Sequence, residues 1–228
     1  MTFTQPRLTA ANPRQRRKEA RPRQLLDAAL SLFVERGFAA TRMEEVAALA
    51  GVSKGTLYLY YPSKEELLKA VIRERLSNEI AAGAAEVAQH VGSHADMLRK
   101  IFEQWWLRIY DSPASGVFKL IITEVRSFPE IADYYAQEVV RPGAELIGGV
   151  LQRGIAAGEF RPVALEAAVH SLVLPMVMLC LHKHSLHACA PAAFPLDPRE
   201  FVHQHVDLMI RGLAADPPRP SAAARKKH

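Results

Sequence analysis

The chain has 228 residues, of which 49% are hydrophobic and 7% aromatic, so it can bury the core of one compact domain or of a small and a large one. Its two cysteines, Cys180 and Cys189, exclude a disulfide framework and a CxxC zinc site, and they favour a reducing compartment. The formal net charge is +5, unevenly placed: residues 1–24 carry +6 and residues 219–228 carry +4, which leaves −5 between them.

Basic ends on an acidic body favour contact with a polyanion, because Lys and Arg release counterions from phosphates. The alternative is a solvated tail that aids solubility, which we favour for the Pro-rich residues 216–228. The longest apolar run, 172–181, has ten residues and contains Pro175, whereas a bilayer crossing needs roughly 18 to 20. No apolar signal segment follows the N-terminal arginines, so we expect a cytoplasmic protein without membrane contact.

Apolar residues recur at spacings of three and four along most of the chain and strand signals are nearly absent, which predicts an all-α protein. The first helix is expected to follow Pro22 and to end at Gly37. The second is expected to begin at Thr41, which would form a capping box with Glu44, and to end at Gly51.

Ser53 is expected to cap a third helix that stops before Pro62. A fourth begins at Ser63 and carries an apolar stripe as far as Ile80. The glycine-containing turn 50–53 between two short helices predicts a helix-turn-helix, although the spacing alone leaves an ordinary helical corner equally open.

The third helix has an unusual composition for a buried helix. Its sequence Lys-Gly-Thr-Leu-Tyr-Leu-Tyr-Tyr, residues 54–61, crowds a glycine, a threonine and three tyrosines into two turns. The tyrosine hydroxyls need hydrogen-bond partners, and phosphate oxygens would supply them.

At these residues the chain resembles the N-terminal domain of TetR-family transcriptional regulators. The match covers about residues 23–72 and rests on Phe33, Gly37-Phe38, Thr41, Val46-Ala47, residues 50–61 and Ser63 to Leu68. Tyr61 departs from the family, which usually has phenylalanine there. Beyond about residue 80 the chain resembles only the helical ligand-binding and dimerisation domains of such proteins, whose ligands vary.

The resemblance and the chemistry of the side chains together imply phosphate contacts. Thr41 and Arg42, at a helix N-terminus, are expected to bind phosphate, and Tyr58, Tyr60 and Lys64 are expected to hold flanking phosphates. The alternatives are core aromatic residues with solvated hydroxyls and a surface lysine at a helix start.

The same helix is expected to supply the groove contacts. Lys54 can donate to guanine, and Thr56 can reach a phosphate or a base edge. Gly55 would let the backbone approach DNA, or it is simply harmless near a helix end, and Leu59 is available for a thymine methyl.

The predicted domains are a basic disordered arm at 1–20, a helix-turn-helix domain at 21–80 that runs into a linking helix, a helical domain at 81–215 and a disordered tail at 216–228. The arm residues expected to follow the minor groove or the DNA backbone are Arg14, Arg16, Arg17, Lys18 and Arg21.

The larger domain is predicted to be an α-helical bundle with helices near 95–110, 114–127, 129–157, 163–187 and 198–214. Its last two helices are unusually apolar and are the candidate homodimer interface, with the intramolecular core as the alternative. Dimerisation would place two recognition helices about 34 to 36 Å apart on a palindromic operator.

The resemblance also implies a ligand cavity for a small-molecule inducer. Large or polar-tipped residues that suit an apolar pocket are Phe102, Trp105, Trp106, Ile109, Tyr110, Phe118, Ile122, Tyr134, His170 and Met176, each of which could instead be a core residue.

We expect no metal, no cofactor and no enzymatic activity. Cys180, His184 and His187 have helical spacing, but no second cysteine or carboxylate completes a tetrahedral site. Nucleotide-binding, nucleophile-elbow and zinc-protease motifs are absent. The predicted function is a DNA-binding repressor released by a ligand. The alternative is a small-molecule-binding helical protein or enzyme whose helix-turn-helix is only structural.

Overall fold

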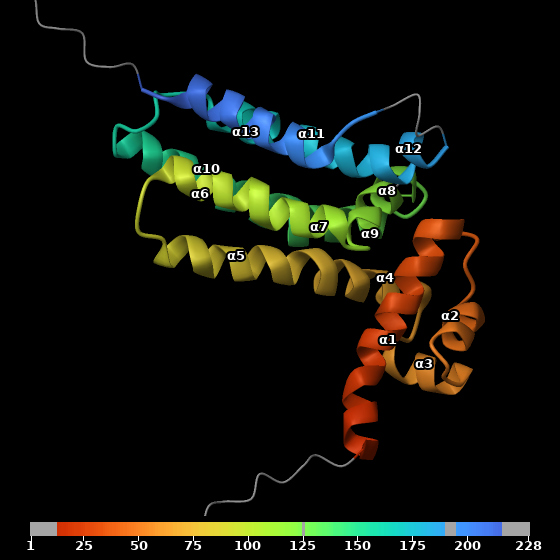
Figure 1. Cartoon of the computed structure of the whole chain (residues 1–228). Helices are drawn as coiled ribbons and strands as arrows, with labels where there is room; N and C mark the ends of the chain where they lie inside the picture. Colours follow the sequence, from red (N-terminus) through yellow and green to blue (C-terminus); the bar gives the residue numbers. More distant parts are fainter. Residues whose placement is uncertain (1–12, 125, 190–194, 216–228) are drawn as a thin grey trace, which may run out of the picture. The chain divides into compact units, whose positions relative to one another are not determined.

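The computed structural model describes residues 13–124, 126–189 and 195–215 (Figure 1). Across these ranges every regular element is a helix, apart from one isolated antiparallel bridge between Phe160 and Ala214. The predicted all-α class is therefore confirmed. The chain forms two compact units, one ending at Val71 and the other beginning at Ile72, so the division falls earlier than the predicted boundary at residue 80.

The first unit contains a three-helix arrangement followed by the start of a fourth helix. The elements are α1 (Pro13–Arg36), α2 (Met43–Leu49), α3 (Lys54–Tyr60) and α4 (Lys64–Ile72). Gly37 and Gly51 have φ values of 89° and 66°, so glycine ends α1 and turns the chain between α2 and α3 as predicted. Leu25, Phe33 and Leu57 are fully buried in the core.

Helix α1 begins nine residues before Pro22, at Pro13. The prediction that residues 13–20 belong to a disordered arm is therefore wrong. Proline is tolerated in the first helical turn, and the Gln, Arg, Lys, Glu and Ala residues after Pro13 are good helix formers, so the polar segment extends the helix even though it lacks an apolar stripe. Residues 1–12 and the side chains of Arg14, Arg16, Arg17 and Lys18 lie outside the described part of the structure.

The start of α2 differs by one residue from the prediction. Arg42, and not Thr41, is the N-cap residue, and its backbone N–H donates to Oε2 of Glu45 at 2.9 Å. Thr41 is buried, and its hydroxyl donates to the carbonyl of Gly37 at 2.8 Å. The Thr41 hydroxyl thus binds the backbone of the loop after α1, so it does not cap α2, and Arg42 is the N-cap residue instead.

The second unit consists of long helices that contain π-helical segments. Its elements are η1 (Arg73–Ser77), α5 (Asn78–Gln89), α6 (His94–Arg99), η2 (Lys100–Trp106), α7 (Leu107–Asp111), α8 (Ser115–Glu124), α9 (Pro129–Tyr135), η3 (Ala136–Val140), α10 (Arg141–Ala156), α11 (Leu165–His184), α12 (Leu186–Cys189) and α13 (Pro198–Leu213). The π segments η1, η2 and η3 each continue directly from one α-helix into the next. The predicted helices of this domain are present with boundaries shifted by a few residues.

These helices pack in layers. Within the second unit, α10 contacts α5, α6 and α11, and α11 also contacts α8 and α13 (Figure 1). Phe102, Val150, Leu172 and Val206 are completely buried in the shared core. This packing leaves α5 on one side and the pair α11 and α13 on the other. Two hollows, described below, lie among these helices.

Helix α11 is longer than the apolar run 172–181 from which a membrane span was excluded. It has 20 residues with a mean hydropathy of 1.6 in its best window, which satisfies the length and composition of a membrane span, so excluding a span by length was wrong. The helix continues through Pro175, in agreement with the predicted helix at 163–187. Met176, Leu179 and Cys180 are buried among other helices, as in a core helix, while only a third of the window is buried overall.

Candidate DNA interface and ligand cavity

Helix α3 has one anchored face and one exposed face. Leu57 is completely buried, whereas Leu59 is 83% exposed and Tyr58 is also exposed. Ser53 caps the helix as predicted, because its Oγ accepts from the backbone N–H of Thr56 at 3.2 Å. The exposed face therefore presents a large apolar side chain to solvent from a helix fixed at its start and on its inner side.

Lys54 lies on this exposed face in an ion pair. Its Nζ is 2.5 Å from Oε1 of Glu44 on α2 and 5.7 Å from the ring centre of Tyr58. The hydrogen bond with Glu44 raises the pKa of Lys54, and the same bond lowers the pKa of Glu44. Both side chains are more than half exposed, so the ion pair is weak and can be exchanged for contacts with DNA.

No neighbouring atom requires a glycine at position 55. A Cβ built on Gly55 would have no heavy atom within 4 Å, and the residue is exposed. Thr56 is half-buried and shares a 2.9 Å hydrogen bond with the Ser53 hydroxyl. Tyr60 is half-buried, with its ring 6.4 Å from that of Tyr61, and Arg42 is exposed. Arg42, Gly55, Thr56 and Tyr60 are therefore all at least partly accessible to solvent.

Two predicted phosphate ligands are engaged inside the protein. Thr41 is 1% exposed, with its hydroxyl bonded to the α1 end and loop, which leaves no donor for a phosphate. Lys64 donates from Nζ to the carbonyls of Phe38 at 2.8 Å, Ala39 at 3.1 Å and Thr41 at 3.1 Å, and it lies over the Phe38 ring. All three ammonium protons thus have protein acceptors, and Lys64 ties the start of α4 to the loop between α1 and α2.

We therefore expect Lys64→Ala to act mainly on stability. Losing charge-assisted bonds to three carbonyls should lower the free energy of unfolding by about 1–3 kcal/mol, since the site is half-buried. Urea unfolding followed by circular dichroism measures this loss. Arg36→Ala in the same unit is the control, because its exposed ion pair with Glu45 should contribute less than about 1 kcal/mol. Unchanged stability with a flatter salt dependence of DNA binding would restore the phosphate role.

A polar hollow adjoins the start of α3 and adds residues that sequence reasoning missed. Arg21 and Gln24 of α1 line it together with Ser53 and Thr56. Arg21 was predicted as part of the basic arm, whereas Gln24 and Ser53 were not assigned to DNA. Only Gln24 could have been found from the sequence, because it lies three positions after Arg21 and therefore shares one face of α1 with it.

The second unit encloses an apolar cavity of about 310 Å³ between its central helices. Six of the ten predicted ligand residues line it, namely Trp105, Trp106, Ile109, Phe118, Ile122 and His170. Leu76 of η1, Trp105 and Trp106 of η2, and Val139 and Val140 of η3 place all three π segments on its wall. The volume lies at the lower end of the range for small-molecule sites.

The other four predicted residues do not line the cavity. Phe102 and Met176 are fully buried core residues. Tyr110 lies beneath the ammonium of Lys183, 4.7 Å from its ring centre, and Tyr134 faces the guanidinium of Arg73 at 5.8 Å. The neighbouring Tyr135 lines the cavity in place of Tyr134, because one residue of helical register turns a side chain by about 100°.

The interior of the cavity offers little charge. Burial raises the pKa of the Tyr135 phenol well above its usual range, so this hydroxyl stays neutral. Burial also raises the pKa of the nearby Cys180 thiol to about 12. The lining residues Glu79 and His170 are exposed. Ile122, Val140 and Leu174 form a half-exposed apolar mouth, so the enclosed space suits an uncharged, apolar group.

One histidine near the end of α11, His184, takes part in a hydrogen bond with a buried serine. Nε2 of His184 lies 2.8 Å from Oγ of the buried Ser115, and Lys183 donates to the same oxygen at 3.2 Å. Burial, with the positive charges of Lys183 and Lys119, lowers the pKa of His184 to about 4. In the described ranges, no three His, Cys, Asp or Glu side chains form a group that could hold a metal ion.

Two family models match the chain. The model described as bacterial regulatory proteins of the tetR family matches residues 25–71, and the model described as tetracyclin repressor-like, C-terminal domain matches residues 88–188. The two matches fall on the helix-turn-helix unit and on the helical unit that holds the cavity.

Proteins with similar sequences are transcriptional regulators. The chain is 29% identical to the uncharacterised HTH-type transcriptional regulator YfiR of Bacillus subtilis over 70% of this chain and 77% of that protein. It is 30% identical to the HTH-type transcriptional repressor KstR2 of Rhodococcus jostii over 63% of this chain and 70% of that protein.

Solved structures share the fold. The structure of FadR from Bacillus subtilis in complex with stearoyl-CoA matches with a TM-score of 0.67 at 18% identity, covering 84% of this chain and 98% of that one. The structure of PfmR from Thermus thermophilus matches with a TM-score of 0.65 at 25% identity, covering 82% of this chain and 97% of that one.

Proposed function

The chain belongs to the TetR family and is a DNA-binding regulator of transcription, and from this we propose that it is a cytoplasmic repressor released from its operator by a small apolar molecule. The observation that carries the proposal is the exposed Leu59 beside the buried Leu57 on a capped helix, in a chain that also encloses an apolar cavity. All the relatives named above are regulators, which supports a role without catalysis.

Within this proposal, α3 reads bases and the residues around it hold phosphates. Lys54 donates to a guanine, Leu59 contacts a thymine methyl, and Gly55 allows the backbone to come close. Phosphates on either side are contacted by Arg42, Tyr58, Tyr60 and Arg21. Thr41 and Lys64 support this surface from inside the protein.

We propose a homodimer that binds a palindromic operator. One helix-turn-helix reads a single half-site, so two copies with a twofold axis are needed for two half-sites. The exposed apolar residues Met178 of α11 and Leu208 of α13 supply a surface for this contact, since exposed apolar area marks interaction sites. One side of α11 packs in the core of its own chain, and the dimer would bury the opposite side. Burial on both sides accounts for the high mean hydropathy of this helix.

Met178→Glu is expected to weaken the dimer. The side chain is 59% exposed in the single chain, and a carboxylate at a twofold interface would meet its own copy and lose solvation. We expect at least a tenfold increase in the dimer dissociation constant, measured by sedimentation velocity. Val91→Glu, at an almost fully exposed position outside α11 and α13, is the control. A mutant that remains as dimeric as the parent would contradict the proposed face.

The experiment that tests the function is selection of bound fragments from random DNA, followed by footprinting. The expected result is a palindrome with half-sites about one helical turn apart, protected near a gene that the protein represses. Candidate ligands are then added to the complex. A ligand releases DNA only if it prefers the conformation that binds the operator poorly, so tighter operator binding with ligand would contradict the proposed release.

A further inference from the structure

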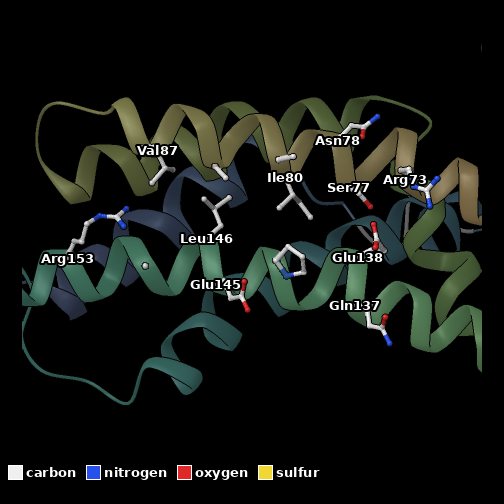
Figure 2. Close-up of a pocket in the computed structure, with 15 residues that line it drawn as sticks. Arg73, Ser77, Asn78, Ile80, Val87, Gln137, Glu138, Glu145, Leu146 and Arg153 are labelled. Carbon is white, nitrogen blue, oxygen red and sulfur yellow. The ribbon is translucent and has the colours of Figure 1, made fainter.

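A second hollow lies beside the apolar cavity, as an open groove between α5 and α10. Figure 2 shows its residues along the facing sides of the two helices. Polar side chains gather at one end, where Ser77 and Glu138 point toward one another and Arg73, Asn78 and Gln137 lie around them, whereas Arg153 lies at the opposite end. Smaller side chains, such as Ala81 and Ala84, line the floor between these ends.

The groove and the cavity share part of their wall. Ile80 and Leu146 line both spaces, and Figure 2 shows the two side chains reaching into the gap between the helices. Ile80 and Leu146 are only half-buried, and neither carries a polar atom on its side chain. A ligand that occupies the cavity therefore needs to pass only flexible apolar side chains to reach the groove.

The polarity of the two spaces differs in a way that favours one kind of ligand. An anionic head group inside the cavity would lose its hydration and would meet mostly apolar side chains. The buried Nε1–H of Trp106, which has no hydrogen-bond partner among the described residues, is a single uncharged donor. The mouth formed by Ile122, Val140 and Leu174 is also apolar. The groove is the polar space that adjoins the cavity, so a polar end of the ligand is best placed there.

The Arg73 end of the groove has hydrogen-bonding capacity that the protein leaves unused. The Oγ of Ser77 is buried without a hydrogen-bond partner among the described residues. The Arg73 guanidinium is exposed, faces the Tyr134 ring, and has no carboxylate within ion-pair distance in the described ranges. A hydroxyl and a guanidinium one helical turn apart are suitable donors for a carboxylate or phosphate. Glu138 at the same end opposes an anion and limits the affinity.

We propose that the ligand is a single-chain amphiphile whose apolar tail fills the cavity and whose anionic head lies at the Ser77 and Arg73 end of the groove. This inference rests on the proposed function of the cavity as the inducer site. The head is a carboxylate or a phosphate, and both sources are tested separately below.

The test uses the full-length protein and decyl compounds that differ only in the head group. Decanoate, decyl phosphate, decanol and decyltrimethylammonium are titrated below their micelle-forming concentrations. The chain has two tryptophans, Trp105 and Trp106, and both line the cavity, so intrinsic fluorescence reports its occupancy. At least one of the two anions is expected to bind at least tenfold more tightly than decanol, and decyltrimethylammonium more weakly than decanol. Shortening the tail by one methylene should weaken binding by about fourfold.

Three variants locate the head group. Arg73→Gln should remove the tenfold preference for the anion over decanol while leaving decanol binding unchanged. Glu138→Gln should strengthen anion binding several-fold, because it removes a nearby negative charge. Arg153→Gln, in the same groove but at the other end, is the matched control and should change neither affinity.

Several outcomes would overturn the inference. They are equal binding of all four compounds, a preference for the ammonium, or an anion preference that survives Arg73→Gln or is lost with Arg153→Gln. Operator binding by the ligand-free protein is measured in parallel. If the parent protein binds its operator but shows no preference among the amphiphiles, only this inference is refuted. If the parent protein binds no operator, the proposed function is refuted.

Discussion

A Leu59→Glu variant is expected to lose specific operator binding while keeping its fold. The side chain is 83% exposed, so the substitution removes almost no buried surface and should change the midpoint of thermal unfolding little. On DNA it removes an apolar contact and brings a carboxylate close to phosphates. Each dimer carries two copies, and a lost base contact costs about 1–3 kcal/mol per half-site. The operator affinity should therefore fall by about 30-fold or more, which a fluorescence-anisotropy titration measures.

The control for Leu59→Glu is Val91→Glu, which adds the same charge at an exposed apolar position of the second unit. This variant should bind the operator as the parent does, apart from a small change in the salt dependence. Leu59→Glu with parent-like operator affinity would contradict the assignment of α3 as the recognition helix. The result is separable from misfolding because circular dichroism and thermal unfolding are recorded on the same samples.

A Gly83→Ala variant is expected to destabilise the second unit and to reshape the cavity. Gly83 of α5 is buried, and a Cβ at this position would lie 1.8 Å from Cζ3 of Trp105, a separation that no non-bonded pair of carbon atoms adopts. The indole of Trp105 is nearly buried, so it has to move toward the cavity that it lines. Overpacking of this kind costs about 1–3 kcal/mol, which differential scanning calorimetry records as a lower unfolding temperature.

Two further variants separate the clash from a general effect of alanine in a helix. Gly212→Ala on α13 has no atom within 4 Å of its new Cβ and should stabilise the helix by up to about 1 kcal/mol. In a double-mutant cycle, Gly83→Ala should cost less stability in a Trp105→Leu background than in the parent, because the smaller side chain leaves room for the methyl group. If Gly83→Ala alone raises the unfolding temperature, the close approach of Trp105 to α5 is wrong.

Features set by local chemistry were predictable from the sequence. Ser53 caps α3 and Gly37 ends α1 because the hydroxyl and the left-handed glycine act on backbone groups a few residues away. The exposure of Leu59 followed from the buried Leu57 two positions earlier on the same helix. These contacts depend on neighbours in sequence, so composition and spacing are sufficient to infer them.

Features set by distant contacts were not predictable. The ammonium of Lys64 bonds to carbonyls 23 to 26 positions earlier, and no local pattern distinguishes it from a surface lysine. The burial of Thr41 depends likewise on the carbonyls of α1 and its loop. The choice of Tyr135 over Tyr134 as a cavity residue depends on the helical register at the start of η3. Alternating apolar and aromatic residues leave that register undetermined.

The three π segments on the cavity wall suggest how related genes diversify. A π turn holds one residue more than an α turn, so deletion of a single codon in η1, η2 or η3 would convert the segment to an ordinary helix without breaking it. The side chains beyond the deletion would rotate relative to the cavity, and a different set of them would line it. Single-codon insertions and deletions within otherwise aligned helices are therefore a direct evolutionary route to new inducer preferences, alongside point substitutions.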